Sequence, residues 1–148
     1  MFNEKEIKMA EMDMAKSSED YGAAKELVKI THYNGALNRA YYSIFHLMCA
    51  RLVLDGLGFS KHSAVIGKFR ELYLNKDFEG DLKKRLSDII TDSETLRNSS
   101  DYERGFYADE AMVKKTLEDV KFFNDTILAY INNLISENES RSIKSWAK

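Results

Sequence analysis

The chain has 148 residues, of which 44% are hydrophobic and 31% charged, which is typical of a single folded domain and too apolar for a disordered chain. The formal net charge of −2 gives no general attraction to nucleic acid or anionic lipid, and no apolar run is long enough to span a membrane. Proline is absent and glycine occurs only seven times, so the strongest helix breakers are nearly missing. These numbers predict an all-α fold.

The N-terminal end carries charged residues where a signal peptide would have an apolar core. The chain also has a single cysteine, Cys49, which excludes an internal disulfide. We therefore expect a cytoplasmic protein with reduced thiols and no contact with a membrane.

From Asn3 to about Ile30, apolar residues recur at three- and four-residue spacings with charges between them, which predicts a long amphipathic helix. Residues 31–35 form the first break. From Ala36 to about Leu54 the chain is apolar on almost every side, which predicts a helix at the centre of the fold or at a subunit interface. Because a bundle of this size has little room to bury both sides of that helix, we expect a homodimer.

Residues 55–60 form the clearest loop, and Ser60 is placed to cap a third helix that runs to Tyr73. A short turn follows. The next apolar period predicts a fourth helix from Glu79 to Leu96, which should stop in the polar residues that come after it.

A fifth helix begins near Asp109, which is a suitable N-cap, and runs for about 26 residues. Residues 1–135 should thus form one antiparallel up-and-down bundle of four to five helices. Residues 136–148 are polar and show no apolar period, so we interpret them as a mobile C-terminal tail.

Polar side chains share one side of the second predicted helix. At 100° per residue, Arg39, Tyr42 and His46 fall within about 60° of one another. The opposite, apolar side is sufficient to bury this helix, so the polar strip is free to face a cleft, another helix or a second subunit. Two interpretations stay open, a semi-buried hydrogen-bond network and a ligand-binding strip.

Arg97 is unusual because it falls on the apolar side of the fourth helix, within about 20° of the direction of Leu86. An arginine in that position needs a carboxylate, a phosphate or a subunit partner. Asp101 and Tyr102 follow it, so both an Arg97–Asp101 ion pair at the helix end and a functional role are open.

Several other chemistries lack the residues that they need. Three histidines and one cysteine show no zinc-ligand spacing, and no glycine-rich phosphate loop is present, so we expect neither a metal nor a cofactor. At the start of the third helix, Lys61 and His62 stand beside exposed backbone amides, and this arrangement can hold a phosphate.

Three segments resemble the small stand-alone HEPN-domain proteins of bacteria and archaea. They are residues 33–46 (YNGALNRAYYSIFH), residues 58–66 (GFSKHSAVI) and the pair Leu96-Arg97 followed by Ser100-Asp101-Tyr102. The resemblance covers about residues 3–130. It implies an up-and-down helical bundle that is often dimeric and often encoded beside a minimal nucleotidyltransferase, as a toxin–antitoxin or defence pair.

Active HEPN ribonucleases carry Arg-x4–6-His near the end of a late helix, where paired motifs from two subunits form a metal-independent site. In this sequence Arg97 matches the arginine, and Tyr102 stands where the histidine would be. The resemblance implies that Arg97 holds a phosphate, Asp101 orients it and Tyr102 donates a hydrogen bond. A phenol is a poor base at pH 7, which leaves nuclease activity open. Arg39 and His46 have the same spacing but lie on the wrong helix.

Two functions therefore remain. The first is an RNA- or nucleotide-binding HEPN component of a toxin–antitoxin or defence module, with metal-independent ribonuclease activity. The second is a non-catalytic HEPN interaction protein that docks a minimal nucleotidyltransferase partner.

Overall fold

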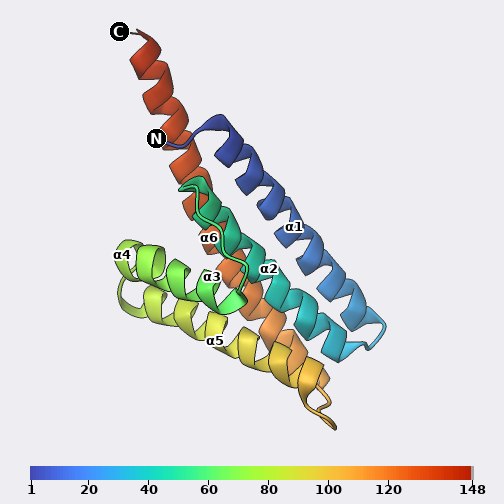
Figure 1. The fold of residues 1–148 in the computed structure, drawn as a ribbon. Helices are drawn as coiled ribbons and strands as arrows, with labels where there is room; N and C mark the ends of the chain where they lie inside the picture. Colours follow the sequence, from blue (N-terminus) through green and yellow to red (C-terminus); the bar gives the residue numbers. More distant parts are fainter. Residues whose placement is uncertain (148) are drawn as a thin grey trace.

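A computed structural model describes residues 1–147, which fold into an all-α bundle (Figure 1). The predicted fold class is thus confirmed. None of the described helices is both long and apolar enough to cross a membrane. The elements in chain order are α1 (Glu4–Lys29), α2 (Tyr33–Leu54), α3 (His62–Phe69), a π-helical turn (Arg70–Leu74), α4 (Asn75–Asp77), α5 (Gly80–Tyr102) and α6 (Glu110–Ala147).

Helices α1 and α2 form an antiparallel pair along most of their length (Figure 1). The buried residues of α1 are Ala10, Ser17 and Ala24, which are small and recur every seven residues, or about two helical turns. Small side chains along this seam let the two helices approach closely. The seam places the polar residues beside it, including Asp20, against the polar strip of α2.

Helix α2 lies at the centre of the bundle, which is one of the two positions that its composition predicts. Of its 22 residues, 13 are buried, and it packs against α1, α3, α5 and α6. One chain alone therefore buries the helix whose apolar composition led us to expect a subunit interface. The burial argument for a homodimer no longer applies, and the dimer stays a prediction.

Two helix starts differ from those expected. Helix α2 begins at Tyr33, three residues before Ala36, and the backbone N–H of Ala36 already bonds the carbonyl of His32. Lys61, and not Ser60, is the N-cap of α3, and its side chain makes no capping hydrogen bond. The prediction that Ser60 caps this helix was wrong, because the loop enters the helix one residue later.

Helix α5 also extends further than predicted, through Tyr102 instead of Leu96. The Ser100 hydroxyl donates to the Arg97 carbonyl at 3.0 Å, and Asn38 Nδ2 of α2 donates to Asp101 Oδ2 at 2.8 Å. These contacts hold a polar stretch in the helix although its residues favour turns. The tertiary contact between Asn38 and Asp101 here overrides the local preference.

Helix α6 continues to Ala147, so the residues expected to form a tail are helical as far as the structure describes them. The buried amide of Asn138 explains part of this extension. Its Oδ1 accepts a hydrogen bond from the Phe2 backbone N–H at 2.8 Å, and its Nδ2 donates to the Phe2 carbonyl at 3.3 Å. The N-terminus is thereby fastened to α6 (Figure 1). Residue 148 of the predicted tail lies outside the described residues.

Candidate functional site

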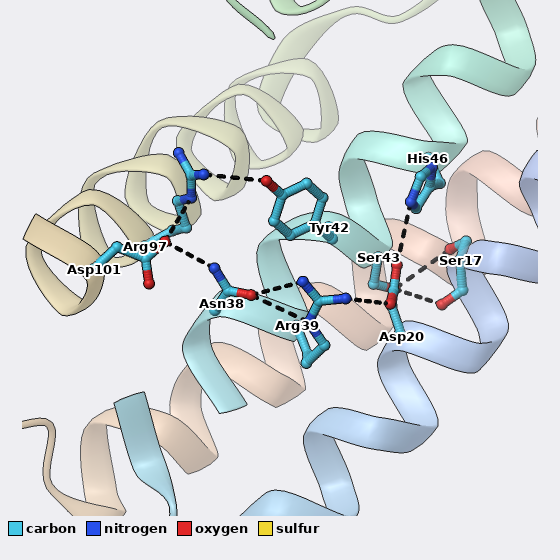
Figure 2. A network of polar contacts seen from close by, with 9 residues as sticks. All are labelled: Ser17, Asp20, Asn38, Arg39, Tyr42, Ser43, His46, Arg97 and Asp101. Atoms are coloured by element: carbon cyan, nitrogen blue, oxygen red, sulfur yellow. Dashed lines mark hydrogen bonds and ion pairs between the residues drawn. The ribbon is translucent and has the colours of Figure 1, made fainter. Parts of the chain in front are cut away.

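A continuous network of polar side chains joins α5, α2 and α1 (Figure 2). Adjacent members are linked by hydrogen bonds or ion pairs of 2.8–3.3 Å. The network brings together most of the polar residues that the sequence singled out. Its members are Arg97 and Asp101 of α5, Asn38, Arg39, Tyr42 and His46 of α2, and Asp20 of α1.

Arg97 stands at the α5 end of this network. Its Nε lies 3.1 Å from Asp101 Oδ2, and its Nη2 donates to the Tyr42 hydroxyl oxygen at 3.1 Å. The Nε–H is buried yet is not aligned for a hydrogen bond with any described residue, so its contact with Asp101 is purely that of opposite charges. The ion pair expected from the sequence is present, and only 16% of the arginine side chain is exposed.

Three tyrosine rings surround the guanidinium group of Arg97. Its central carbon lies 5.3 Å from the ring centroid of Tyr41 and 5.5 Å from those of Tyr42 and Tyr102. These distances fall in the range of cation–π attraction. The rings fix the direction of the arginine while part of its edge stays in contact with solvent.

Tyr102 is 72% exposed. The sequence suggested that Arg97 and Tyr102 can meet only if the helix unwinds after Leu96. On an ideal helix, side chains five positions apart point in directions that differ by about 140° around the axis. The helix does not unwind, and the long arginine side chain still reaches the Tyr102 ring. Together these side chains form the Arg97 site, which consists of Asn38, Tyr42, Arg97, Asp101 and Tyr102.

Asn38 is a member of the site that the sequence analysis missed. Its Nδ2 donates to Asp101, and its Oδ1 accepts from Arg39 Nε at 3.1 Å and Nη2 at 2.8 Å. It therefore connects Arg39, which it contacts directly, with Arg97, which it reaches through Asp101. Its position one turn before Tyr42 on the same helix is the signal by which it could have been found.

Arg39 lies between α2 and α1. Its Nη1 is 3.0 Å from Asp20 Oδ1, and its guanidinium carbon lies 4.8 Å from the Tyr42 ring centroid. Asp20 was not predicted, because nothing in the spacing of α1 shows which residue of α2 it faces. This pairing satisfies the charge of Arg39 within the protein.

His46 is at the α1 end of the network, on the other side of Tyr42 from Arg97 (Figure 2). Its Nε2 lies 3.3 Å from Asp20 Oδ2. Burial lowers the pKa of His46 by more than the nearby carboxylates of Asp20 and Asp13 raise it. His46 is therefore mainly neutral at pH 7, and its contact with Asp20 is not a full ion pair.

His62 approaches the same tyrosines from the start of α3. Its Nδ1 lies 3.1 Å from the Tyr41 hydroxyl oxygen, and its ring stacks on Phe45 with centroids 4.1 Å apart. Burial, and then the charge of Arg97, lower the pKa of His62 below its ordinary value. The sequence predicts Lys61 and His62 as a phosphate-binding pair. Only His62 makes described contacts with these aromatic residues, while Lys61 is exposed.

The arrangement offers a fixed cation, tyrosine hydroxyls and a neutral imidazole, which together suit an anionic oxygen ligand. Across the side chains that the structure describes, no three His, Cys, Asp or Glu residues gather as metal ligands.

These features define an all-α bundle domain with an arginine–tyrosine site between two of its helices. The model of the HEPN domain family matches residues 10–130, and the chain belongs to this family. A protein named UPF0332 protein from Thermotoga maritima is 32% identical over 132 residues, which cover 89% of this chain and 97% of that protein. The recognition made from the sequence is thereby confirmed.

Two proteins of Methanocaldococcus jannaschii are also similar to the chain. One is named putative toxin MJ0605 and is 38% identical over 86 residues, which cover 58% of this chain and 62% of that protein. The other is named putative toxin MJ1304 and is 30% identical over 90 residues, which cover 61% of this chain and 59% of that protein.

Proposed function

We propose that this HEPN protein is the RNA-binding component of a toxin–antitoxin module and that Arg97 binds a phosphate of the RNA backbone. The similarity to two proteins named as putative toxins supports the toxin–antitoxin part. The hydrogen-bond donors of the Arg97 site support the phosphate part.

The observation that carries the proposal is a surplus of donors at the Arg97 site. The Tyr42 oxygen accepts a hydrogen bond from Arg97, and its own O–H has no acceptor among the described residues. The exposed Tyr102 hydroxyl likewise has no described partner. Asp101 is the one carboxylate paired with Arg97, and it also accepts from Asn38. Unused O–H groups beside a fixed cation are suited to a phosphodiester, which carries acceptors only.

A local phosphate-binding site is also consistent with the low net charge of the chain. A net charge of −2 gives no general attraction to RNA, so binding must come from a local site in which geometry counts for more than long-range charge. We therefore expect a shallow dependence of affinity on salt, typical of one or two phosphate contacts.

The experiment is to titrate the protein into a fluorescein-labelled, mixed-sequence single-stranded RNA and follow the anisotropy. Arg97→Ala should weaken binding about 10- to 100-fold, because a hydrogen bond to a charged group contributes about 1.5–3 kcal/mol. Circular dichroism should show an unchanged helical content.

Arg85→Ala is the matched control. It removes the same charge from the same helix, but Arg85 lies over the Phe122 ring at 3.5 Å and not in the Arg97 site. We expect its affinity for RNA to stay within about twofold of wild type, because the loss of a surface charge away from the site has only a small effect. Equal binding by wild type and both variants would refute the phosphate role of Arg97.

A further inference from the structure

Arg70 is a half-buried arginine at the first position of the π-helical turn. Its Nη1 donates to the Ser87 hydroxyl, and its Nη2 donates to the Ser87 carbonyl at 3.3 Å and to the Thr91 hydroxyl at 2.9 Å. These three acceptors are neutral, so they fix the direction of the guanidinium group without balancing its charge. Two of its five N–H groups, the Nε–H and one on Nη1, have no partner among the described residues.

The lack of an ion pair distinguishes Arg70 from the other arginines that are buried or half-buried. Arg39, Arg51 and Arg97 each pair with an aspartate, at 3.0–3.2 Å. Arg70 forms no ion pair with a described carboxylate, and burial lowers its pKa by more than two carboxylates of α5 raise it. A guanidinium that is partly desolvated but not paired is suited to an anionic ligand, and its shape matches a phosphate.

Arg70 and the Arg97 site lie along one side of α5. Ser87 and Asp101 point in directions within about 40° of each other around this helix, and Arg70 contacts the first while Arg97 contacts the second. Thr91, the other contact of Arg70, comes six residues before Arg97, or about 9 Å along the axis. In a stacked nucleic-acid strand a phosphate occurs about every 3.4 Å, so this interval corresponds to about three nucleotides.

We propose that Arg70 binds a second phosphate of the RNA strand whose first phosphate is bound by Arg97, a role that rests on the proposed function. The ligand is then a strand of at least about four nucleotides, which runs along α5 from the Arg97 site to the π-helical turn. A single nucleotide is too short to reach both arginines.

Glu94 comes between these two phosphate contacts on α5 and affects the path of the strand. Its negative charge acts on Arg70 and also on Tyr41 and His62, which lie beside Arg97. A phosphate next to this carboxylate is repelled, so the intervening phosphates should point into solvent. The strand therefore makes two phosphate contacts with a gap between them, in agreement with the shallow salt dependence expected above.

The test compares a fluorescein-labelled dinucleotide with a labelled single-stranded RNA of about 12 nucleotides, by anisotropy. Arg70→Ala should weaken binding of the longer RNA about tenfold, because it removes hydrogen bonds from a charged group, and should leave binding of the dinucleotide within about twofold. Arg97→Ala should weaken binding of both. For Arg70→Ala the plot of log affinity against log salt should also lose about 0.7 of its slope, the contribution of one phosphate of a single strand.

Lys68→Ala is the matched control, because it removes a positive charge from the same segment that is already paired with Glu71 at 3.2 Å. It should bind both RNAs within about twofold of wild type. Since Arg70 also ties the π-helical turn to α5, Arg70→Gln serves as a second variant, with a neutral amide that can still donate to α5. It should show the same selective loss for the longer RNA, with an unchanged helical content by circular dichroism.

The outcomes separate this inference from the proposed function. If folded Arg70→Ala or Arg70→Gln binds the longer RNA as well as wild type while Arg97→Ala does not, the second contact is refuted and the proposed function stands. An equal loss of affinity for the dinucleotide and the longer RNA also overturns it, because both arginines would then contact one phosphate. If Arg97→Ala binds both RNAs as well as wild type, the proposed function itself fails.

Discussion

The chain places an arginine four residues before an aspartate twice, and the two places differ in what the tyrosines around them do. The first is the Arg51 cluster, formed by Arg51, Asp55, Tyr73, Asp77 and Tyr130. The second is the Arg97 site. In both, the arginine and aspartate form an ion pair, at 3.2 Å for Arg51–Asp55 and 3.1 Å for Arg97–Asp101.

In the Arg51 cluster the polar hydrogens of the tyrosines are used within the protein. Tyr73 donates to Asp55 at 2.7 Å, and Tyr130 donates to Asp77 at 2.5 Å while accepting from Arg51 Nε at 2.9 Å. The guanidinium carbon lies 3.9 Å from the Tyr73 ring centroid. The cluster therefore ties α2 to the π-helical turn, α4 and α6, and leaves little for a ligand.

In the Arg97 site the hydroxyl hydrogens of the tyrosines are unused within the protein. Neither the Tyr42 nor the Tyr102 hydroxyl has a described acceptor, and among the described side chains no aromatic ring centroid is closer than 5.3 Å to the guanidinium carbon. An arginine–aspartate pair is thus not by itself a sign of function. The hydrogen bonds of its neighbours distinguish a structural arginine from one that can bind a ligand.

The largest expected effect tests this contrast through protein stability. Arg51→Ala should lower the free energy of unfolding by about 3 kcal/mol, because it removes a close cation–π contact and two hydrogen bonds to a charged group. Arg97→Ala should lower it by less than about 1 kcal/mol, in the range of partly exposed ion pairs. Urea unfolding followed by circular dichroism measures both, and equal losses would contradict the comparison.

The second-largest effect is the difference in stability loss when a single tyrosine hydroxyl is removed from each region. Tyr130→Phe should cost about 1–3 kcal/mol, because Arg51 Nε and Asp77 both lose a partner. Tyr42→Phe should cost less than about 1 kcal/mol, since it deletes one hydrogen bond at a site in contact with solvent. The same urea experiment checks this pair, with the opposite ranking as the contradicting result.

A change of cation shape should affect RNA binding more than folding. Arg97→Lys keeps the charge but loses the planar guanidinium that reaches Asp101, Tyr42 and a phosphate together. We expect about tenfold weaker binding to single-stranded RNA, or about 1.4 kcal/mol. Anisotropy titrations provide the measurement, and wild-type affinity in this variant would show that charge alone is sufficient.

The smallest expected effect is a dependence of stability on pH. Burial lowers the pKa of both His46 and His62 in the folded protein, so the unfolded chain binds more protons near pH 6. Stability is then fully present above about pH 6.5 and falls as the pH drops toward about 5.5, by at most about 1.4 kcal/mol per pH unit for each histidine.

His46→Gln should remove part of that slope. The groups that face His46 are Asp20, Asp13 and Lys16 of α1 and Arg39 of α2, and the carboxylates weaken the shift without reversing it. Urea unfolding at three pH values measures the slope, and stability that rises as the pH falls from 7 to 5.5 would contradict the assigned direction.

The sequence by itself determined the helical class, the apolar character of the second helix on almost every side and the inward direction of Arg97. It also placed Arg39, Tyr42 and His46 on one side of a helix. All of these follow from composition or from the 100° rotation per residue, which act within one helix and need no knowledge of its neighbours.

Only the tertiary structure decided which helices meet. The contacts of Asn38 with Asp101, of Asp20 with Arg39 and of His62 with Tyr41 each join different elements. Their register depends on how closely packed side chains let the helices cross, which no periodicity within one helix records. The contact of Asn38 with Asp101 supports α5 beyond Leu96, and Asn138 joins α6 to the N-terminus beyond the predicted end of the bundle. Polar residues with weak helix preference become helical there because partners elsewhere in the chain satisfy their hydrogen bonds.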